Sequence, residues 1–278
     1  MSEARDGSDK GFVHLRTRSP YSVLEGAIPI AKMAELAKAD GMPAVALTDT
    51  NNLFGALEFS ELLSGAGLQP ITGCTLSIRL TDPRPGDAAQ PDGTIALLVA
   101  NETGYRNLLK LTSAAFLEVE ATELPHITAD RLLAHADGLI ALTGGPDSVL
   151  NRWIVDGRKA DAANWLSRLS DGLGDRLYVE LQRHGRREEL IAEDWLVEAA
   201  YERGLPLVAT NECFFPDRDM HSAHDALLCI AESEYLTVEN RRRVTPDHFF
   251  AGAEEMRARF EDLPEAIANT VEIARRCA

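Results

Sequence analysis

The sequence predicts an α/β fold in which a barrel-like sheet is surrounded by helices. Short apolar or β-branched runs alternate along the chain with longer amphipathic stretches. Such alternation is typical of parallel strands joined by crossover helices. The 278 residues, of which 45% are hydrophobic, are also sufficient for one large core. We therefore expect one (β/α) barrel with a small appendage, and not an antiparallel sandwich.

Six runs are expected to form strands because each is short and apolar or β-branched. They span residues 12–15, 44–48, 94–100, 138–143, 177–181 and 206–210. A further run at 71–75 is expected to end another strand. Functional groups of a parallel barrel lie at the carboxyl ends of its strands, so these ends are where chemistry is expected.

Helices are expected between the strands, where apolar residues recur at helical spacing. These stretches span residues 28–38, 53–63, 103–117, 159–170 and 188–203, and two more follow at 254–260 and 264–278. In the last stretch Ile267, Val271 and Ile273 form an apolar stripe, so either this helix folds back on the barrel or the natural chain continues. The segment 81–93 is rich in Pro, Gly and Asp and is expected to be a surface loop.

The charge and hydropathy of the chain exclude several classes of function. A formal net charge of −16 argues against this chain gripping nucleic acid alone, because phosphate neutralisation requires clustered Lys and Arg. The sequence contains no apolar run as long as a membrane span, and its polar, acidic start is unlike a secretion signal. We expect a cytoplasmic protein with no membrane contact.

Two arginines, Arg16 and Arg18, stand at the end of the first expected strand. Histidines at this spacing on a strand end form a common clamp for a divalent metal. Arginine is permanently charged and only donates hydrogen bonds, so it cannot be a metal ligand. The chain therefore has the pattern of a metal enzyme in which the first two ligands are replaced.

Eight blocks identify a family resemblance. They are FVHLRTRSPYSVLEG, MPAVALTDTNNLFGALEF, QPITGC, NETGYRNLLKL, VELQRHG, PLVATNECFF, AHDALLCI and DLPEAIANTVEIARRC. In this order they resemble the amino-terminal PHP domain of bacterial replicative DNA polymerase III alpha subunits. The resemblance implies a PHP-type distorted (β/α)7 barrel with a C-terminal helical extension. It divides the chain into a disordered leader at 1–11, a barrel domain at 12–235 and a helical extension at 236–278 that leads toward a polymerase palm absent from this chain.

Active PHP domains hold up to three divalent metals at their strand ends, and this sequence departs from that ligand set at most positions. His184 matches the family and stands nearly alone. We interpret the matching positions as a vestigial metal site with no catalytic residue, no bound metal and no cofactor. These positions are Arg16, Arg18, Glu25, Asp49, Thr50, Thr75, Gly145, His184, Glu212 and Phe214. Magnesium is expected only at the polymerase active site of the longer parent protein.

The two arginines are expected to take over the electrostatic role of the metals. Carboxylates left buried without a metal would be costly, and a guanidinium group can pair with them bidentately. We predict that Arg16 and Arg18 pair with some of Glu25, Asp49 and Glu212. A second basic feature, the run from Arg241 to Arg243, is either a contact for DNA or an acidic partner, or a solvated turn.

The resemblance implies that the parent protein is a DNA-directed DNA polymerase, a nucleotidyltransferase of chromosomal replication. This chain would then be a scaffold without catalytic activity that docks the proofreading exonuclease subunit and meets DNA only through the full-length protein. One alternative is an active metal-dependent phosphoesterase or 3′–5′ exonuclease of the PHP type. Another is a free-standing barrel with an unrelated partner. The parent is either the high-fidelity replicase or an error-prone relative, and two of the blocks look closer to the replicase.

Overall fold

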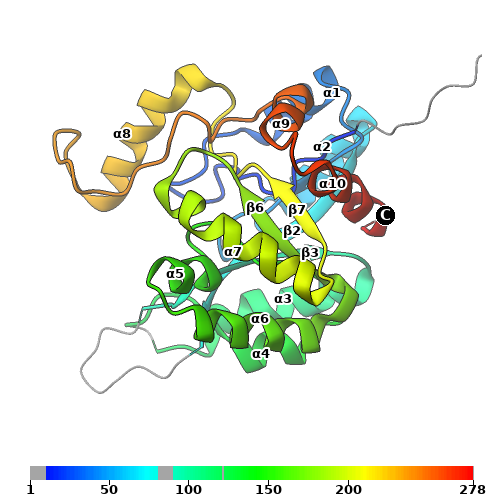
Figure 1. The fold of residues 1–278 in the computed structure, drawn as a ribbon. Helices are drawn as coiled ribbons and strands as arrows, with labels where there is room; N and C mark the ends of the chain where they lie inside the picture. The colour runs from blue at the N-terminus through cyan, green and yellow to red at the C-terminus, as the bar shows by residue number, and fades with distance from the viewer. Residues whose placement is uncertain (1–10, 81–89, 121, 278) are drawn as a thin grey trace, which may run out of the picture.

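The computed structural model describes residues 11–80, 90–120 and 122–277. The expected leader, apart from residue 11, and most of the expected loop at 81–93 lie outside these described residues. The described chain folds as a curled sheet with helices around it (Figure 1).

Six strands form the main path of the sheet in the order β1-β2-β3-β5-β6-β7. A short strand, β4, pairs beside β2. The strand bounds are β1 Ala44–Leu47, β2 Gln69–Arg79, β3 Gly93–Val99, β4 Ile127–Thr128, β5 Leu139–Leu142, β6 Leu177–Gln182 and β7 Leu207–Thr210. Every expected strand after the first is thus confirmed within a few residues, while the run at 71–75 lies in the middle of the long β2.

The first expected strand closes the barrel through isolated bridges instead of a regular ladder. His14 bridges Val45 of β1, and Thr17 bridges Cys213 just beyond β7. The backbone N–H of Ala46 donates to the carbonyl of His14 at 2.7 Å, and that of Arg18 donates to the carbonyl of Cys213 at 3.0 Å. Residues 12–18 therefore lie between the two edge strands and bring Arg16 and Arg18 to the mouth of the barrel.

The expectation of an all-parallel sheet is wrong at β3. This strand runs antiparallel to both of its neighbours, β2 and β5. In the order of elements that the structure describes, no helix stands between β2 and β3, and an antiparallel pair requires no crossover helix. The other neighbours in the path, β1 with β2, β5 with β6 and β6 with β7, are parallel as expected.

The expected helices are confirmed, and additional ones occur. Helices at the expected places are α1 Ile30–Ala39, α2 Ala56–Ala66, α3 Glu102–Leu117, α6 Lys159–Leu173, α7 Arg187–Arg203, α9 Ala253–Arg259 and α10 Pro264–Arg276. The others are α4 Ala129–Ala134, α5 Val149–Val155 and α8 His221–Glu232. Figure 1 shows α8 and the loop after it extending to one side of the barrel.

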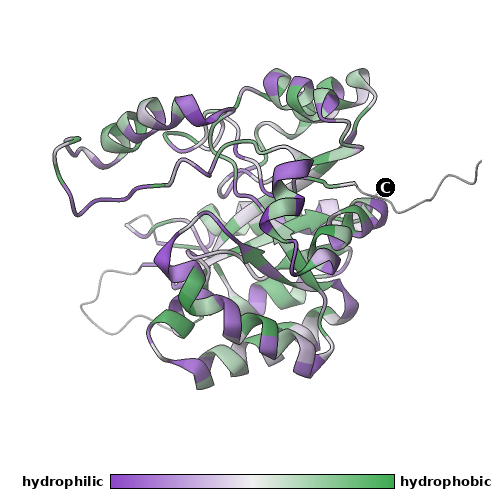
Figure 2. Ribbon diagram, turned by 45° about the horizontal axis from the view of Figure 1, so that its top comes forward, coloured by the Kyte–Doolittle hydropathy of each residue, from purple (hydrophilic) through white to green (hydrophobic). Residues whose placement is uncertain are grey.

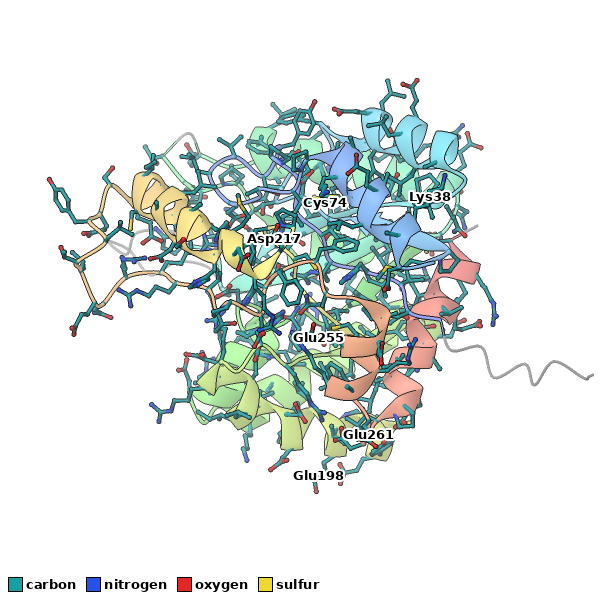
Figure 3. The ribbon with its side chains drawn as sticks, turned by 90° about the horizontal axis from the view of Figure 1, so that it is seen from above. Lys38, Cys74, Glu198, Asp217, Glu255 and Glu261 are labelled. Atoms are coloured by element: carbon teal, nitrogen blue, oxygen red, sulfur yellow. The ribbon has the colours of Figure 1, made fainter. Side chains whose placement is uncertain are left out.

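Hydrophobic side chains concentrate between the sheet and the helices. The largest core cluster joins residues such as Phe12, Leu97 and Leu166, all buried. Figure 2 shows hydrophobic colouring on the central strands and alternating colours on the helices around them. In Figure 3 Cys74 lies in the interior, while Glu198 and Glu261 lie at the periphery. Burial of this apolar surface is the main stabilising contribution to the fold.

The final helix folds back on the barrel. Ile267, Val271 and Ile273, the apolar stripe expected from the sequence, are buried. Val271 and Ile273 pack with Val13 and Leu15 of the closing segment. The hydroxyl of Thr270 also accepts a hydrogen bond from the backbone N–H of Val13 at 3.1 Å. The helix thereby supports the backbone that carries the two arginines.

Candidate functional site at the barrel mouth

Arg16 and Arg18 converge on one carboxylate oxygen at the barrel mouth. Arg16 Nη2 and Arg18 Nη2 each donate to Oε1 of Glu212 at 2.5 Å. The three side chains are only 2%, 6% and 9% exposed. This confirms the predicted pairing with Glu212, and it fixes the segment 12–18 to the loop after β7 by a buried ion pair.

Glu180 is a second partner of Arg16, and the sequence reasoning did not identify it as one. Its Oε2 accepts from Arg16 Nη1 at 3.2 Å, and its Oε1 accepts from the hydroxyl of Thr210 and from Nε2 of Gln182. The sequence does indicate such a partner, because Glu180 is a charged residue inside the apolar strand β6, and a buried charge requires a partner. The network thus joins three neighbouring elements of the barrel: the segment 12–18, β6 and the end of β7.

Gly145 provides the space for this network. A Cβ atom added at Gly145 would lie 2.0 Å from Oε1 of Gln182, well inside van der Waals contact. The carbonyl of Gly145 accepts from the backbone N–H of Ser148, which holds the turn after β5. The glycine at this predicted site position therefore lets Gln182 approach the backbone, and any larger side chain would displace it.

Asp49, one of the three candidate carboxylates, accepts hydrogen bonds from serine groups, so the arginine pairing is met by Glu212 and not by Asp49. It accepts from the backbone N–H of Ser19 at 2.8 Å, from the Ser19 hydroxyl at 2.6 Å and from the Ser22 hydroxyl at 2.6 Å. Ser19 and Ser22, in the turn that follows Arg18, thus occupy the carboxylate of Asp49. Burial raises the pKa of Asp49 although these hydrogen bonds oppose the shift.

Glu25 lies beside the arginine pair, but its direct partners are others. Its carboxylate accepts from the hydroxyl of Thr50 and from Nη2 of Arg242, both at 2.5–2.6 Å. Thr50 also accepts from Arg18 Nη1 at 2.6 Å, and so it links Arg18 to Glu25. The hydroxyl of Thr75 donates to the carbonyl of Thr48 at 3.2 Å. Both threonines act here as neutral hydrogen-bonding groups.

His184 is held by hydrogen bonds at both ring nitrogens. Nδ1 lies 2.7 Å from Oε1 of Glu189, and Nε2 accepts from the backbone N–H of Glu212 at 3.2 Å. Its ring stacks on that of His248 with centroids 3.8 Å apart. Phe214 lies beside His248 and against the guanidinium of Arg18. His184 therefore orients the loop that carries Glu212.

The electrostatics of the mouth favour a charged carboxylate and neutral imidazoles. Burial alone would raise the pKa of Glu212, but the charges of Arg16 and Arg18 outweigh it and hold the pKa well below 4.5. Burial lowers the pKa of His184 from 6.5 to about 3 and also lowers that of His248. At neutral pH Glu212 is thus ionised between two cations, and both rings are uncharged.

These residues do not fit a divalent metal. Within residues 11–80, 90–120 and 122–277, no group of three or more His, Cys, Asp and Glu side chains is placed to hold a metal ion. Oε1 of Glu212 faces two guanidinium groups, and both oxygens of Asp49 accept hydrogen bonds from serine. His184 offers Nε2 to a backbone N–H. A cation here would have to displace several charge-assisted hydrogen bonds.

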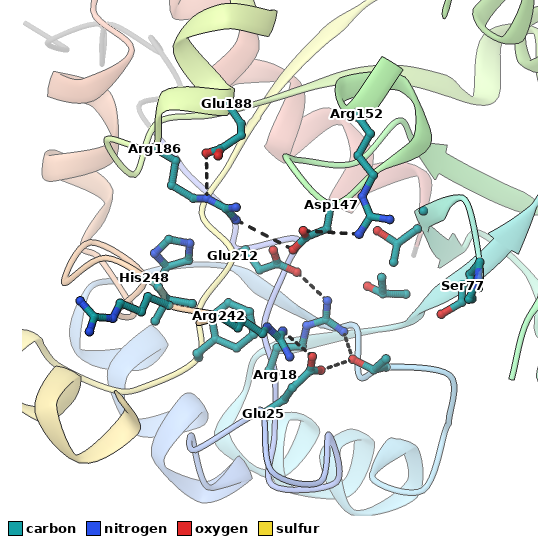
Figure 4. Close-up of a pocket in the computed structure, with 18 of the residues that line it drawn as sticks. Arg18, Glu25, Ser77, Asp147, Arg152, Arg186, Glu188, Glu212, Arg242 and His248 are labelled. Atoms are coloured by element: carbon teal, nitrogen blue, oxygen red, sulfur yellow. Dashed lines mark hydrogen bonds and ion pairs between the residues drawn. The ribbon is translucent and has the colours of Figure 1, made fainter. Parts of the chain in front are cut away.

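A pocket of about 800 Å³ opens outside this network (Figure 4). Arg18, Glu25 and Glu212 line it, and so does the run from Arg241 to Arg243. Arg241 is buried in a bidentate pair with Asp225, with distances of 2.5 and 2.6 Å, so the two alternatives for this run concern Arg242 and Arg243. Arg242 and Arg243 are exposed.

No helix in the described part of the chain is long and apolar enough to cross a membrane.

Two relatives illustrate what the chain is similar to. DNA polymerase III subunit alpha of Caulobacter vibrioides is 45% identical over 273 residues, which cover 98% of this chain and 24% of the relative. The Escherichia coli protein of the same name is 37% identical over 272 residues, covering 97% of this chain and 23% of the relative. The chain thus spans about a quarter of the length of these relatives.

Solved structures and a family match complete the comparison. An amidohydrolase from Chromobacterium violaceum aligns with a TM-score of 0.45 and 12% identity, covering 90% of this chain and 97% of that one. A Bacteroides vulgatus protein, described as containing a predicted PHP-like metal-dependent phosphoesterase, aligns with a TM-score of 0.46 and 12% identity, covering 88% and 61%. Residues 14–184 match the PHP domain. The chain therefore belongs to the PHP domain family.

Proposed function

We propose that the chain is the amino-terminal PHP region of a DNA polymerase III alpha subunit and serves chromosomal replication as a metal-free structural domain. Similarity to alpha subunits over 97–98% of the chain supports this assignment. The parent protein would carry out DNA synthesis in the cytoplasm with magnesium at a palm site outside this chain. A formal net charge of −16 is consistent with DNA contact through the full-length protein only.

The observation that carries the proposal is the pair of guanidinium groups on Glu212. Arg16 and Arg18 bind the carboxylate at 2.5 Å each, at the strand ends where a metallohydrolase needs ligands. A catalytic metal needs about three protein ligands and one open position for water. The two positive charges would repel a divalent cation and already neutralise the carboxylate. The mouth therefore holds the barrel together and does not activate water.

Metal content and phosphoesterase activity of the purified chain test this proposal. We expect less than stoichiometric zinc, manganese or iron after dialysis. The unchanged chain should turn over p-nitrophenyl phosphate and single-stranded DNA only at the background level, and His184→Ala should not change that level. His135→Ala, at the end of α4, is the matched control. Stoichiometric metal together with turnover that His184→Ala abolishes and His135→Ala preserves would establish an active phosphoesterase and overturn the proposal.

We further propose that this domain docks the proofreading exonuclease subunit of the replicase. The support is the assignment to alpha subunits together with a barrel mouth that is filled by structural ion pairs. The cognate exonuclease should be retained on the immobilised chain, and it should not be retained on a PHP phosphoesterase of similar size. Retention by neither protein, measured with a folded chain, would leave the domain as a scaffold of the polymerase alone and would contradict the docking role.

A further inference from the structure

Residues 221–244 form an arm that has a defined shape of its own. The arm consists of α8 and the segment that returns from the end of α8, and it extends to one side in Figure 1. The bidentate pair of Arg241 with Asp225 joins the returning segment to the helix. The ring of His221 adds a second link, because its Nε2 lies 2.9 Å from the carbonyl oxygen of Val244. The arm is therefore shaped by contacts between its own residues.

The base of the arm is attached to the barrel through Glu25. Nε2 of His224 lies 2.7 Å from the carbonyl oxygen of Glu25. Arg242 Nη2 donates to the carboxylate of the same residue at 2.6 Å. The ring of His224 also lies against the rings of Phe214 and Phe215. The base is thus fixed at the barrel mouth, and the other end of the arm extends away from it (Figure 1).

The far end of the arm, residues 230–239, exposes three large apolar side chains, and we call it the arm tip. Ile230 is 67% exposed, Tyr235 77% and Leu236 55%. Helix α8 ends just before Ser233, whose φ of 55° is uncommon for a residue other than glycine. Among the residues that the structure describes, the hydrogen bonds of the arm tip stay within the arm. Exposed apolar surface of this kind marks a site of interaction.

The charge of the arm tip limits what can cover it. Residues 226–240 include Glu232, Glu234 and Glu239 and contain no Lys or Arg. Nucleic acid does not fit, because its phosphates would be repelled. A symmetric contact with a second copy would bring the glutamates of two tips together in chains that each have a net charge of −16. The arm tip therefore fits a protein surface that offers apolar side chains surrounded by Lys or Arg.

The length of the relatives indicates which protein surface this is. We propose that the arm tip packs against the part of the parent polypeptide that follows residue 278. The inference rests on the proposed function, in which this chain is one region of a longer alpha subunit. The chain covers 23–24% of the two alpha subunits compared above, so about three quarters of such a parent lies outside it. A surface tethered to the same polypeptide has a high effective concentration, so a small contact area is sufficient.

The contact would link the barrel mouth to the rest of the parent through Glu25. The carboxylate of Glu25 accepts from Arg242 of the arm and from the hydroxyl of Thr50, which in turn accepts from Arg18. Because the arm is already shaped and attached at its base, packing of its tip would immobilise few further groups. Glu25, one of the vestigial metal-site positions, would thereby serve as the anchor of the arm.

Hydrogen exchange of backbone amides, followed by mass spectrometry, tests the proposal on the 278-residue chain and on the full-length parent. The amides of the arm tip beyond α8 should exchange rapidly in the short chain. In the parent they should exchange at least about tenfold more slowly, because packing protects them from water. The slowing should not depend on protein concentration, as expected for a contact within one polypeptide. Equal exchange in both proteins would overturn the proposal, and so would slowing that appears only at high protein concentration.

Two variants of the parent test the side chains of the arm tip. Tyr235→Ser combined with Leu236→Ser should restore rapid exchange at the tip. The same double change should leave the urea midpoint of the 278-residue chain unaltered, because both side chains are exposed there. Leu190→Ser, on α7 at 72% exposure, is the matched control and should leave the slow exchange of the tip unchanged. Slow exchange that persists in the double variant would contradict the proposal.

Two further measurements keep this inference separate from the proposed function. Slowing that appears only after the exonuclease subunit is added would assign the arm tip to that subunit and overturn the contact within the parent. Templated DNA synthesis by a parent whose arm tip exchanges rapidly would also overturn it, while the proposed assignment would stand. A parent that lacks templated synthesis and yet protects its arm tip would support the contact and contradict the assignment.

Discussion

The barrel mouth and the outer surface each contain an arginine between two carboxylates, and the two clusters differ in exposure. At the mouth, Arg16 lies between Glu180 and Glu212, with side chains 2%, 0% and 9% exposed. On the outside, Arg183 binds Glu193 and Asp262 at 2.6 Å each, and the side chain of Asp262 is 63% exposed. Similar chemical groups at similar distances thus occur in two different environments.

The difference shows that distance alone does not measure the contribution of an ion pair. Water can replace either partner of Arg183, so removing that arginine leaves the carboxylates hydrated. Water does not reach Glu180, so removing Arg16 leaves a buried charge with hydrogen bonds only from neutral groups. We infer that the inner cluster is indispensable to this chain because its members are already buried, and not because an ion pair is intrinsically stabilising.

The largest expected effect comes from replacing the inner arginine. Arg16→Met should lower the free energy of unfolding by about 3–5 kcal/mol, because it leaves Glu180 buried without a cation. Arg183→Met, the matched change outside, should cost about 1 kcal/mol or less. Urea unfolding at pH 7 measures both values. Equal losses for the two variants would show that burial does not distinguish the clusters.

A second replacement separates the lost charge pair from lost packing. Adding Glu180→Gln to Arg16→Met removes the uncompensated charge, so the double variant should be more stable than Arg16→Met alone. Glu212 keeps Arg18 as a partner in both variants. A double variant that recovers no stability would mean that the lost hydrogen bonds and packing of the guanidinium group, and not the uncompensated charge of Glu180, cause the loss.

The fold was predictable where the sequence has local periodicity. The strands β1, β6 and β7 and the helices α3, α6 and α7 were predicted within a few residues, because apolar spacing directly reflects burial. The antiparallel direction of β3 was not predicted, because the same apolar run fits either direction. Direction is set by the pairing within the sheet, where β3 lies antiparallel to both β2 and β5.

The site was predictable only in part for a related reason. The pairing of Arg16 and Arg18 with Glu212 followed from charge chemistry, since buried carboxylates need cations. Charge chemistry did not single out Glu212 among the three candidate carboxylates, and Asp49 is instead satisfied by two serines in the adjacent turn. The pairing of Glu25 with Arg242 joins residues 217 positions apart, and no local pattern encodes such a contact.

A smaller effect is expected from pH, and it should also distinguish the inner cluster from the outer one. Burial lowers the pKa of His184 from 6.5 to about 3, so the unfolded chain takes up a proton first as the pH falls below 6.5. The stability that the neutral ring contributes is therefore complete above pH 6.5 and is lost between pH 6.5 and about 3. The loss from this ring should reach about 2 kcal/mol at pH 5.

Unfolding by urea at pH 7, 6 and 5 measures this loss, and His184→Asn should reduce the slope of stability against pH. His14 and His248, whose pKa values are also lowered by burial, maintain part of the slope in this variant. Glu189 faces His184, and burial raises the pKa of Glu189 above 4.5. The opposing contribution of Glu189 therefore grows at lower pH, and the comparison ends at pH 5.

The outer cluster provides the control. Asp262 has a pKa below 3.8, chiefly because Arg183 donates a hydrogen bond to it, so Arg183→Met should leave the slope from pH 7 to 5 unchanged. A slope that changes equally in His184→Asn and Arg183→Met would contradict the assignment of acid sensitivity to the buried mouth.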